Sequence, residues 1–129
     1  MNQPQKIVIV DDDEMTLELM RTGLEARHFT VYTAVDSMDA IKKIQESKPD
    51  LILLDIMLPD LSGIELLSLI QYGNCLEQAP VILMSGLNDV KVAHAADKLG
   101  AAGYLVKPFD MDVLMEKITA LPGFKPLPA

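Results

Sequence analysis

Five short features stand at the ends of apolar segments along this chain, and their side chains could act together. They are Val10-Asp11-Asp12-Asp13, Asp55-Ile56-Met57-Leu58-Pro59, Ser85-Gly86, Tyr104 and Lys107-Pro108-Phe109. If the apolar segments are neighbouring strands, three carboxylates, one hydroxyl and one amine meet at one edge of one sheet. Oxygen ligands of this kind suit a hard divalent cation, and the amine and hydroxyl suit a phosphoryl group.

The segments before these features have the composition of buried strands. Near-continuous apolar runs of four or five residues occupy positions 6–10, 51–54, 80–84 and 103–106, and a shorter strand is expected at Thr30 to Ala34. Such runs are typical of strands covered on both faces, as in a parallel sheet between helices. Because ligands of open parallel sheets bind beyond the carboxyl ends of the strands, the polar residues stand where a site is expected.

Amphipathic helical patterns separate these strands. We expect five helices. The first runs over Glu14 to Arg27, the second follows a cap at Asp36 or Ser37, and the third runs from Ser62 to Gly73. The fourth runs from a cap at Asn88 or Asp89 to Gly100, and the fifth from a cap at Asp110 to Leu121. Five strand–helix units in succession predict an α/β fold, with a single doubly wound, flavodoxin-like sheet of five parallel strands and five helices.

The composition suits one domain and argues against some partners. The 129 residues are 50% hydrophobic, which is enough for one core. The formal net charge is −8, from 11 basic and 19 acidic residues, and a chain without a basic stripe is a poor direct partner for nucleic acid. Cys75 is the only cysteine, and the residues before Lys6 lead into only four apolar residues, too few for a signal peptide or a membrane span. We therefore expect a cytoplasmic protein that contacts neither nucleic acid nor membrane.

Asp11, Asp12 and Asp55 would form an acidic cluster with Lys107 as the nearby base. Two unit charges about 4 Å apart repel by roughly 4 kcal/mol at an effective dielectric near 20, so a cation is expected among the carboxylates. Few carboxylates, with room for water and phosphate oxygens, favour Mg²⁺. A carboxylate in such a site can also act as a nucleophile and form an aspartyl phosphate. Asp13 is expected to belong to the start of the first helix instead.

The chain resembles the receiver domain of a bacterial two-component response regulator. The resemblance rests on Val10-Asp11-Asp12, Asp55 with Met57-Leu58-Pro59 and Gly63, Met84-Ser85-Gly86 and Lys107-Pro108-Phe109, and it extends from about Lys6 to Leu121. Each motif is unspecific, but all of them in this order are specific. The resemblance implies a five-stranded parallel sheet in the order 2-1-3-4-5. It also implies a receiver domain over residues 1–121, and the Pro-rich residues 122–129 are expected to be a tail or the start of a linker.

The resemblance assigns roles to the acidic residues. Asp55 is the expected phosphoacceptor, which receives a phosphoryl group from a histidine kinase or a histidine phosphotransfer protein. Asp12 is similar to the direct ligand of Mg²⁺, and Asp11 to the acid that holds a metal-bound water. Met57 is similar to the residue whose backbone carbonyl completes the metal site.

The resemblance also implies a switch. Ser85 and Lys107 are similar to the pair that senses the phosphoryl group, and Tyr104 to the aromatic residue that turns inward when the hydroxyl residue moves. The family has a cis peptide before the proline of Lys107-Pro108. We expect a signalling domain that promotes its own phosphotransfer and slow autodephosphorylation, because Met57 and Leu87 would flank the path of the hydrolytic water without orienting it.

A docking surface is expected where a helix is weakly held. The fourth helix would bury mainly alanine and valine, so it should be anchored less firmly than the fifth helix with its Leu and Met side chains. A second copy or an output partner is expected on the face made by the fourth helix, the strand of Tyr104 and the fifth helix. Whether the chain is a stand-alone receiver or part of a longer regulator stays open.

Three other functions fit parts of the pattern. A Mg²⁺-dependent phosphohydrolase of the haloacid-dehalogenase type also uses an aspartate at a strand end, but that family has a second aspartate two residues later, where this chain has Met57. A flavin or dinucleotide module needs a Gly- or hydroxyl-rich loop after the first strand, where Asp11 to Asp13 would repel phosphates. An inert scaffold domain would not bind a metal.

Overall fold

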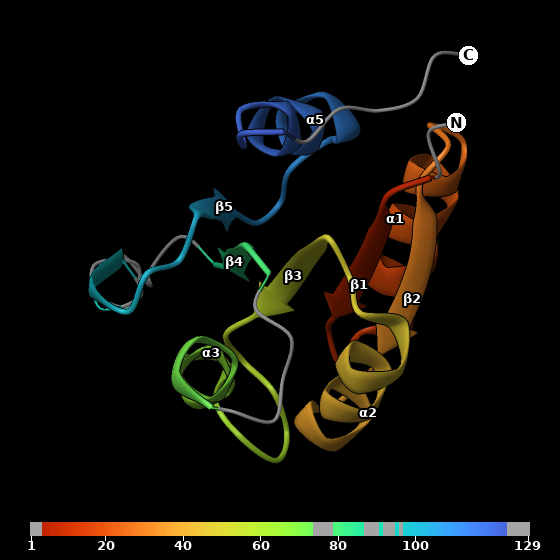
Figure 1. Ribbon diagram of the computed structural model, residues 1–129. Helices are drawn as coiled ribbons and strands as arrows, with labels where there is room; N and C mark the ends of the chain where they lie inside the picture. The colour runs from red at the N-terminus through yellow and green to blue at the C-terminus, as the bar shows by residue number, and fades with distance from the viewer. Residues whose placement is uncertain (1–3, 74–78, 87–90, 92–94, 96, 124–129) are drawn as a thin grey trace.

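The sheet has the predicted strands in the predicted order. The computed structural model describes residues 4–73, 79–86, 91, 95 and 97–123. Its strands run parallel in the order β2-β1-β3-β4-β5 (Figure 1), and their bounds are β1 (Lys6–Val10), β2 (Thr30–Ala34), β3 (Leu51–Asp55), β4 (Val81–Ser85) and β5 (Gly103–Val106). Asp55 and Ser85 are the last residues of their strands, where each pairs with a neighbouring strand.

Four helices have defined bounds: α1 (Glu14–Glu25), α2 (Ser37–Ser47), α3 (Gly63–Tyr72) and α5 (Met111–Thr119). The expected fourth helix lies largely outside the described residues, as do its expected caps Asn88 and Asp89, and also Leu87, Cys75 and the tail from 124. Of that helix, residues 91, 95, 97 and 98 are helical, and Gly100 follows with a φ of 89°. Gly100 is therefore the predicted stop, in a conformation that favours glycine.

The helices begin at side chains that accept hydrogen bonds from their first turns. The four N-caps are Asp13, Asp36, Ser62 and Asp110. Such caps satisfy backbone N–H groups that have no partner within the helix, which is why these residue types stand there. The first helix ends at Glu25 and not at Arg27, because His28 adopts a φ of 71° and the chain turns into β2.

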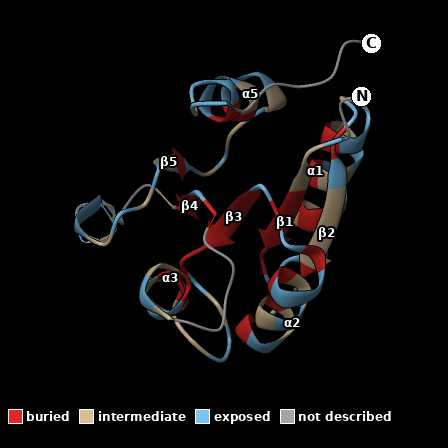
Figure 2. Cartoon of the chain, viewed as in Figure 1, coloured by how far each residue is buried: buried red, intermediate tan, exposed pale blue. Residues whose placement is uncertain are grey.

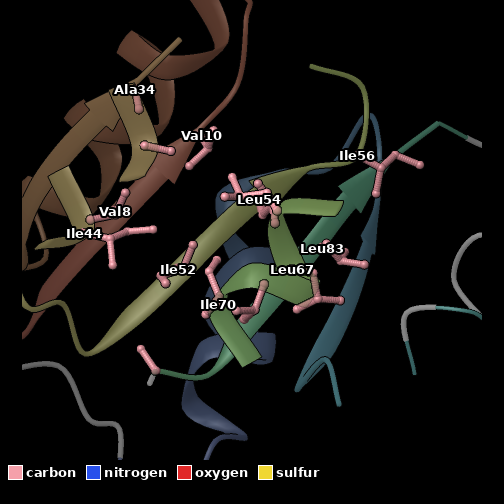
Figure 3. Packing of buried hydrophobic residues seen from close by; sticks show 14 residues of the cluster. Val8, Val10, Ala34, Ile44, Ile52, Leu54, Ile56, Leu67, Ile70 and Leu83 are labelled. Atoms are coloured by element: carbon pink, nitrogen blue, oxygen red, sulfur yellow. The ribbon is translucent and has the colours of Figure 1, made fainter. Parts of the chain in front are cut away.

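Apolar side chains form one core on each face of the sheet. One core joins the sheet to α2 and α3, and Figure 3 shows its members, among them Val8, Ile52, Leu54, Leu67 and Ile70. The other joins the opposite face to α1 and α5, through Leu17, Leu24, Leu114 and Ile118. Figure 2 shows β1 and β3 as buried strands; β3 is buried along its length and β1 from its second residue onward, as their apolar sequences predict.

The carboxyl ends of β1, β3, β4 and β5 bring the polar residues to one edge. Asp11 follows β1, Asp55 and Ser85 end β3 and β4, and Lys107 follows β5. The backbone ties these ends together, since Lys107 N–H donates to the Ser85 carbonyl at 2.7 Å and Ile56 N–H to the Met84 carbonyl at 3.1 Å. Among the residues that the structure describes, no helix has the length and apolarity to cross a membrane.

Candidate functional site

Three carboxylates converge at this edge of the sheet. Asp11, Asp12 and Asp55 each present a carboxylate oxygen, and these oxygens lie within 4.8 Å of one another. Asp11 is fully buried and Asp55 is 5% exposed, whereas Asp12 faces solvent. The sequence prediction that these three residues meet is confirmed. Asp13 instead caps α1, where its carboxylate accepts from Met15 N–H at 3.0 Å.

The ammonium group of Lys107 bridges two of the three carboxylates. Its Nζ lies 2.7 Å from Asp11 Oδ2 and 2.8 Å from Asp55 Oδ2. The peptide bond before Pro108 is cis, as predicted. One positive charge thus stands between two buried negative charges, which lowers their mutual repulsion.

The protonation of this group follows from burial and its charges. Burial raises the pKa of Asp55, and the neighbouring charge of Asp11 adds to the rise, while hydrogen bonds from Lys107 and Met57 oppose it without cancelling it. Burial alone would lower the pKa of Lys107, but its hydrogen bonds to Asp11 and Asp55 outweigh burial and raise it. Lys107 is therefore positively charged at neutral pH.

The loop after β3 folds back over Asp55. Met57 N–H donates to Asp55 Oδ1 at 2.9 Å, while the Met57 side chain is 68% exposed. Gly63 begins α3 and packs against this loop, and its N–H donates to the Ile56 carbonyl at 2.8 Å. A Cβ at Gly63 would lie 2.4 Å from Ile56 Cα and 2.5 Å from the Asp55 carbonyl oxygen, so only glycine fits there.

Ser85 and Tyr104 contact each other on neighbouring strands. The Ser85 hydroxyl is hydrogen-bonded to the Tyr104 hydroxyl, and Ser85 is 1% exposed. The tyrosine ring therefore points inward, toward the residue that ends β4. Ser85 and Tyr104, the two residues expected to form the switch, are therefore adjacent. The Ser85 hydroxyl, which could contact a phosphoryl group, is hydrogen-bonded to Tyr104 instead.

One long-range contact was not predicted from the sequence. The exposed carboxylate of Asp60, in the loop between β3 and α3, accepts hydrogen bonds from the first residues of α2. Ser37 was predicted as a possible cap of α2, but nothing local to Asp60 indicates a partner 23 residues away. The sequence carries only one relevant signal, which is an acidic residue in the short loop that follows Asp55.

The donor set fits a hard divalent cation. Its ligands are carboxylate oxygens, which Mg²⁺, Mn²⁺ and Ca²⁺ prefer over softer ligands. Three carboxylates and one ammonium leave the cluster with a formal charge of −2, which a divalent cation would balance. The cluster can therefore hold a metal, with Asp12 open to solvent for its arrival.

The family model "Response regulator receiver domain" matches residues 7–119, nearly the whole chain. The chain belongs to the response regulator receiver family. Receiver domains are signalling domains of two-component systems that work through phosphorylation, and histidine kinases phosphorylate them. The match decides against the phosphohydrolase and dinucleotide alternatives, and it agrees with the strand order found here.

Several known proteins are similar to this receiver. Protein PilG of Pseudomonas aeruginosa is 32% identical over 96% of the chain and 93% of PilG. Among solved structures, a CheY-like receiver domain protein of Methanospirillum hungatei superposes with a TM-score of 0.84 and 30% identity, covering 92% of this chain and 93% of that one.

Other relatives are longer than this receiver. The regulatory protein PhoP of Bacillus subtilis, named for alkaline phosphatase synthesis, is 33% identical over 91% of this chain but only 48% of PhoP. The phosphate regulon regulatory protein PhoB of Rhizobium meliloti is 36% identical over 90% of this chain and 51% of PhoB. The receiver thus spans about half the length of these transcriptional regulators.

Proposed function

We propose that Asp55 is the phosphoacceptor of this receiver and that Mg²⁺ supports the transfer. The observation that carries this proposal is the convergence of three carboxylates, two of them bridged by the ammonium of Lys107. Asp11, Asp12 and Asp55, with the backbone carbonyl of Met57, would hold the metal. The bound cation would supply positive charge against the oxygens of the transferring phosphoryl group.

The chain's own residues orient the reacting groups. A carboxylate oxygen of Asp55 attacks the phosphorus, and the bond from phosphorus to the donor's imidazole nitrogen breaks as the new phosphorus–oxygen bond forms. The imidazole leaves with the bonding electron pair and takes a proton from solvent. Met57 N–H holds one oxygen of Asp55, so the carboxylate keeps a fixed orientation.

Lys107 and Ser85 respond to the added phosphoryl group. The ammonium of Lys107 already contacts Asp55 and can donate to the new oxygens from nearly the same place. The Ser85 hydroxyl can donate to another oxygen once it releases Tyr104. Exchange of this hydroxyl between Tyr104 and the phosphoryl group would carry the phosphorylation signal to β5.

The remaining predictions concern partners and lifetime. The phosphoryl donor is a histidine kinase or a histidine phosphotransfer protein. The phosphorylated chain then loses its phosphoryl group slowly, by hydrolysis of the aspartyl phosphate without a partner. A second copy or an output partner docks on the face that includes β5 and α5. The exposed side chains of Val106 and Val113, which are 37% and 39% exposed, support a docking role for these two elements.

The test is phosphorylation by a small acyl phosphate, such as acetyl phosphate, followed by intact-mass measurement. The parent chain should gain one phosphoryl group with Mg²⁺ and none with excess EDTA. Asp55→Asn should gain none. Asp50→Asn is the matched control, because Asp50 lies just before β3, at the far end of the strand from the site, and it should react like the parent. Full labelling of the Asp55→Asn variant would contradict the proposal.

A further inference from the structure

The carboxylate of Asp60 fastens the loop between β3 and α3 to the start of α2. Asp60 Oδ1 accepts from Ser37 N–H and Leu61 N–H, each at 2.9 Å, and also from the Ser37 hydroxyl. Asp60 Oδ2 accepts from Met38 N–H at 3.1 Å. Figure 1 shows the loop passing beside the N-terminal end of α2.

Burial and charge both stabilise the contact between Asp60 and Ser37. Ser37 is fully buried, so its hydroxyl has little access to water and depends on Asp60 as its acceptor. The N-terminal end of a helix also attracts negative charge. Hydrogen bonds from the Ser37 hydroxyl and backbone hold the pKa of Asp60 well below its usual range, so the carboxylate is ionised at neutral pH.

Capping of α2 does not by itself account for Asp60. Asp36 is already the N-cap residue, and its side chain accepts from Asp39 N–H at 2.8 Å. Asp60 adds acceptors for Ser37 and Met38 N–H and comes from a different segment. What Asp60 adds beyond capping is a fixed position for its own loop.

That loop carries the backbone that faces the site. Met57 lies three residues before Asp60 and donates its N–H to Asp55 Oδ1 at 2.9 Å. At the other side of the loop, Gly63 N–H donates to the Ile56 carbonyl at 2.8 Å. The contacts of Asp60 and Gly63 restrain the short segment from Asp55 to Asp60. Met57 lies in this segment, so its backbone has little freedom to move away from the Asp55 carboxylate.

We infer that Asp60 is a positioning residue for the metal and phosphoacceptor site: by binding Ser37 and Met38 it holds the Met57 backbone against the carboxylate of Asp55. This inference rests on the function proposed above, in which the Met57 carbonyl and the Asp55 carboxylate share the metal. Partners that orient metal ligands, when removed, cost about 10–100-fold in metal affinity. Asp60 acts through a short backbone segment, so a loss near tenfold is expected.

The test uses Asp60→Ala and Asp60→Asn in the full chain, with Asp50→Ala as the control. Asp50 is a suitable match because it is also exposed and also binds a distant backbone group, Lys6 N–H at 2.8 Å, but at the opposite end of the sheet. Mg²⁺ affinity is measured by calorimetry without any phosphodonor. Hydrogen exchange of the Met57 amide is measured by NMR in the same samples, and urea unfolding reports stability.

The expected result is about tenfold weaker Mg²⁺ binding and faster Met57 amide exchange in Asp60→Ala, with a smaller change in Asp60→Asn, which keeps one acceptor oxygen. Asp50→Ala should leave both readouts unchanged at a comparable loss of stability. If Asp60→Ala does not fold, Ser37→Ala serves instead, because it removes only the hydroxyl donor. It should weaken Mg²⁺ binding two- to threefold and raise the exchange rate of the Met57 amide in proportion.

Two results would overturn the inference. One is equal Mg²⁺ affinity and equal Met57 exchange in the Asp60 and Asp50 variants, and the other is absence of Mg²⁺ binding by the parent chain. Failure of the proposed function has a different signature. If the parent chain takes up no phosphoryl group at Asp55 but the Asp60 variants still lose Mg²⁺ affinity, phosphoacceptance is wrong and the positioning role of Asp60 stands.

Discussion

Lys107→Met removes the positive charge between Asp11 and Asp55 while keeping most of the apolar stem. The carboxylate oxygens lie within 4.8 Å, and at that distance two unit charges repel by roughly 3.5 kcal/mol at an effective dielectric of 20. The Lys107 side chain is 28% exposed, so water already screens part of its effect. We therefore expect the free energy of unfolding to fall by about 2 kcal/mol at neutral pH without metal.

The pH dependence of this loss has a definite sign. The pKa of Asp55 is already raised by burial, and removal of the Lys107 hydrogen bond, which lowers it, moves it higher. A carboxyl with a raised pKa in the folded state stabilises that state at low pH, and this stabilisation is lost as the pH rises through the folded-state pKa. The deficit of the variant should therefore be complete at neutral pH and shrink in mildly acidic buffer, as Asp55 takes up its proton.

The assay is urea unfolding at neutral and mildly acidic pH, with EDTA or with saturating Mg²⁺. Mg²⁺ should recover most of the deficit, because the cation replaces the missing charge and binds only the folded state. Lys43→Met is the control. Lys43 lies on α2 and its side chain is 33% exposed. Its Nζ pairs with Asp39 and donates to the Thr33 carbonyl at 2.7 Å, and it does not bridge the carboxylates of the cluster. This substitution should cost less than about 1 kcal/mol. If Lys107→Met behaves like this control, with no response to pH or Mg²⁺, the electrostatic reasoning is wrong.

Two further predictions concern the loop and the lifetime of the phosphoryl group. Gly63→Ala should cost about 3 kcal/mol in urea unfolding, because its Cβ would meet backbone atoms at 2.4 and 2.5 Å. Gly23→Ala should be nearly neutral, because its Cβ meets only the flexible end of Met111 at 2.7 Å and alanine favours the helix by about 1 kcal/mol. Equal losses of unfolding free energy at the two glycines would refute this contrast. Met57→Asn combined with Leu87→Glu should speed loss of the phosphoryl group about tenfold, which corresponds to roughly 1.4 kcal/mol of barrier. If the decay of the labelled protein, followed by intact mass, is unchanged, water access does not control the lifetime.

Much of the fold follows from local patterns in the sequence. Apolar runs that stop at Asp11, Asp55, Ser85 and Lys107 identify the strands, and the parallel arrangement brings their carboxyl ends to one edge. The caps at Asp36 and Ser62 depend on side chains within one turn, so they could also be predicted. The end of α1 could not, because the left-handed conformation of His28 depends on how the chain enters β2.

The convergence of the three aspartates could be predicted, but the individual contacts around them could not. The meeting of the three aspartates follows from strand order, whereas the bridging position of Lys107 between Asp11 and Asp55 depends on the path of the chain after β5. The contact between Asp60 and Ser37 joins the loop after β3 to the first residue of α2, and both are residue types that are ordinary in turns and at helix starts. No periodicity or spacing in the sequence reports such a contact, because it depends on tertiary structure.

The central claim is that Asp55 carries the phosphoryl group, and chemical mapping of the labelled residue tests it most directly. An aspartyl phosphate is an acyl phosphate, so borohydride reduces it to homoserine, whereas unmodified aspartate does not react. The chain is phosphorylated with a small acyl phosphate and Mg²⁺, reduced, digested and sequenced by mass spectrometry. The account predicts homoserine at position 55 and aspartate at positions 11, 12 and 60. Homoserine at one of those three positions, with unmodified aspartate at position 55, would contradict it.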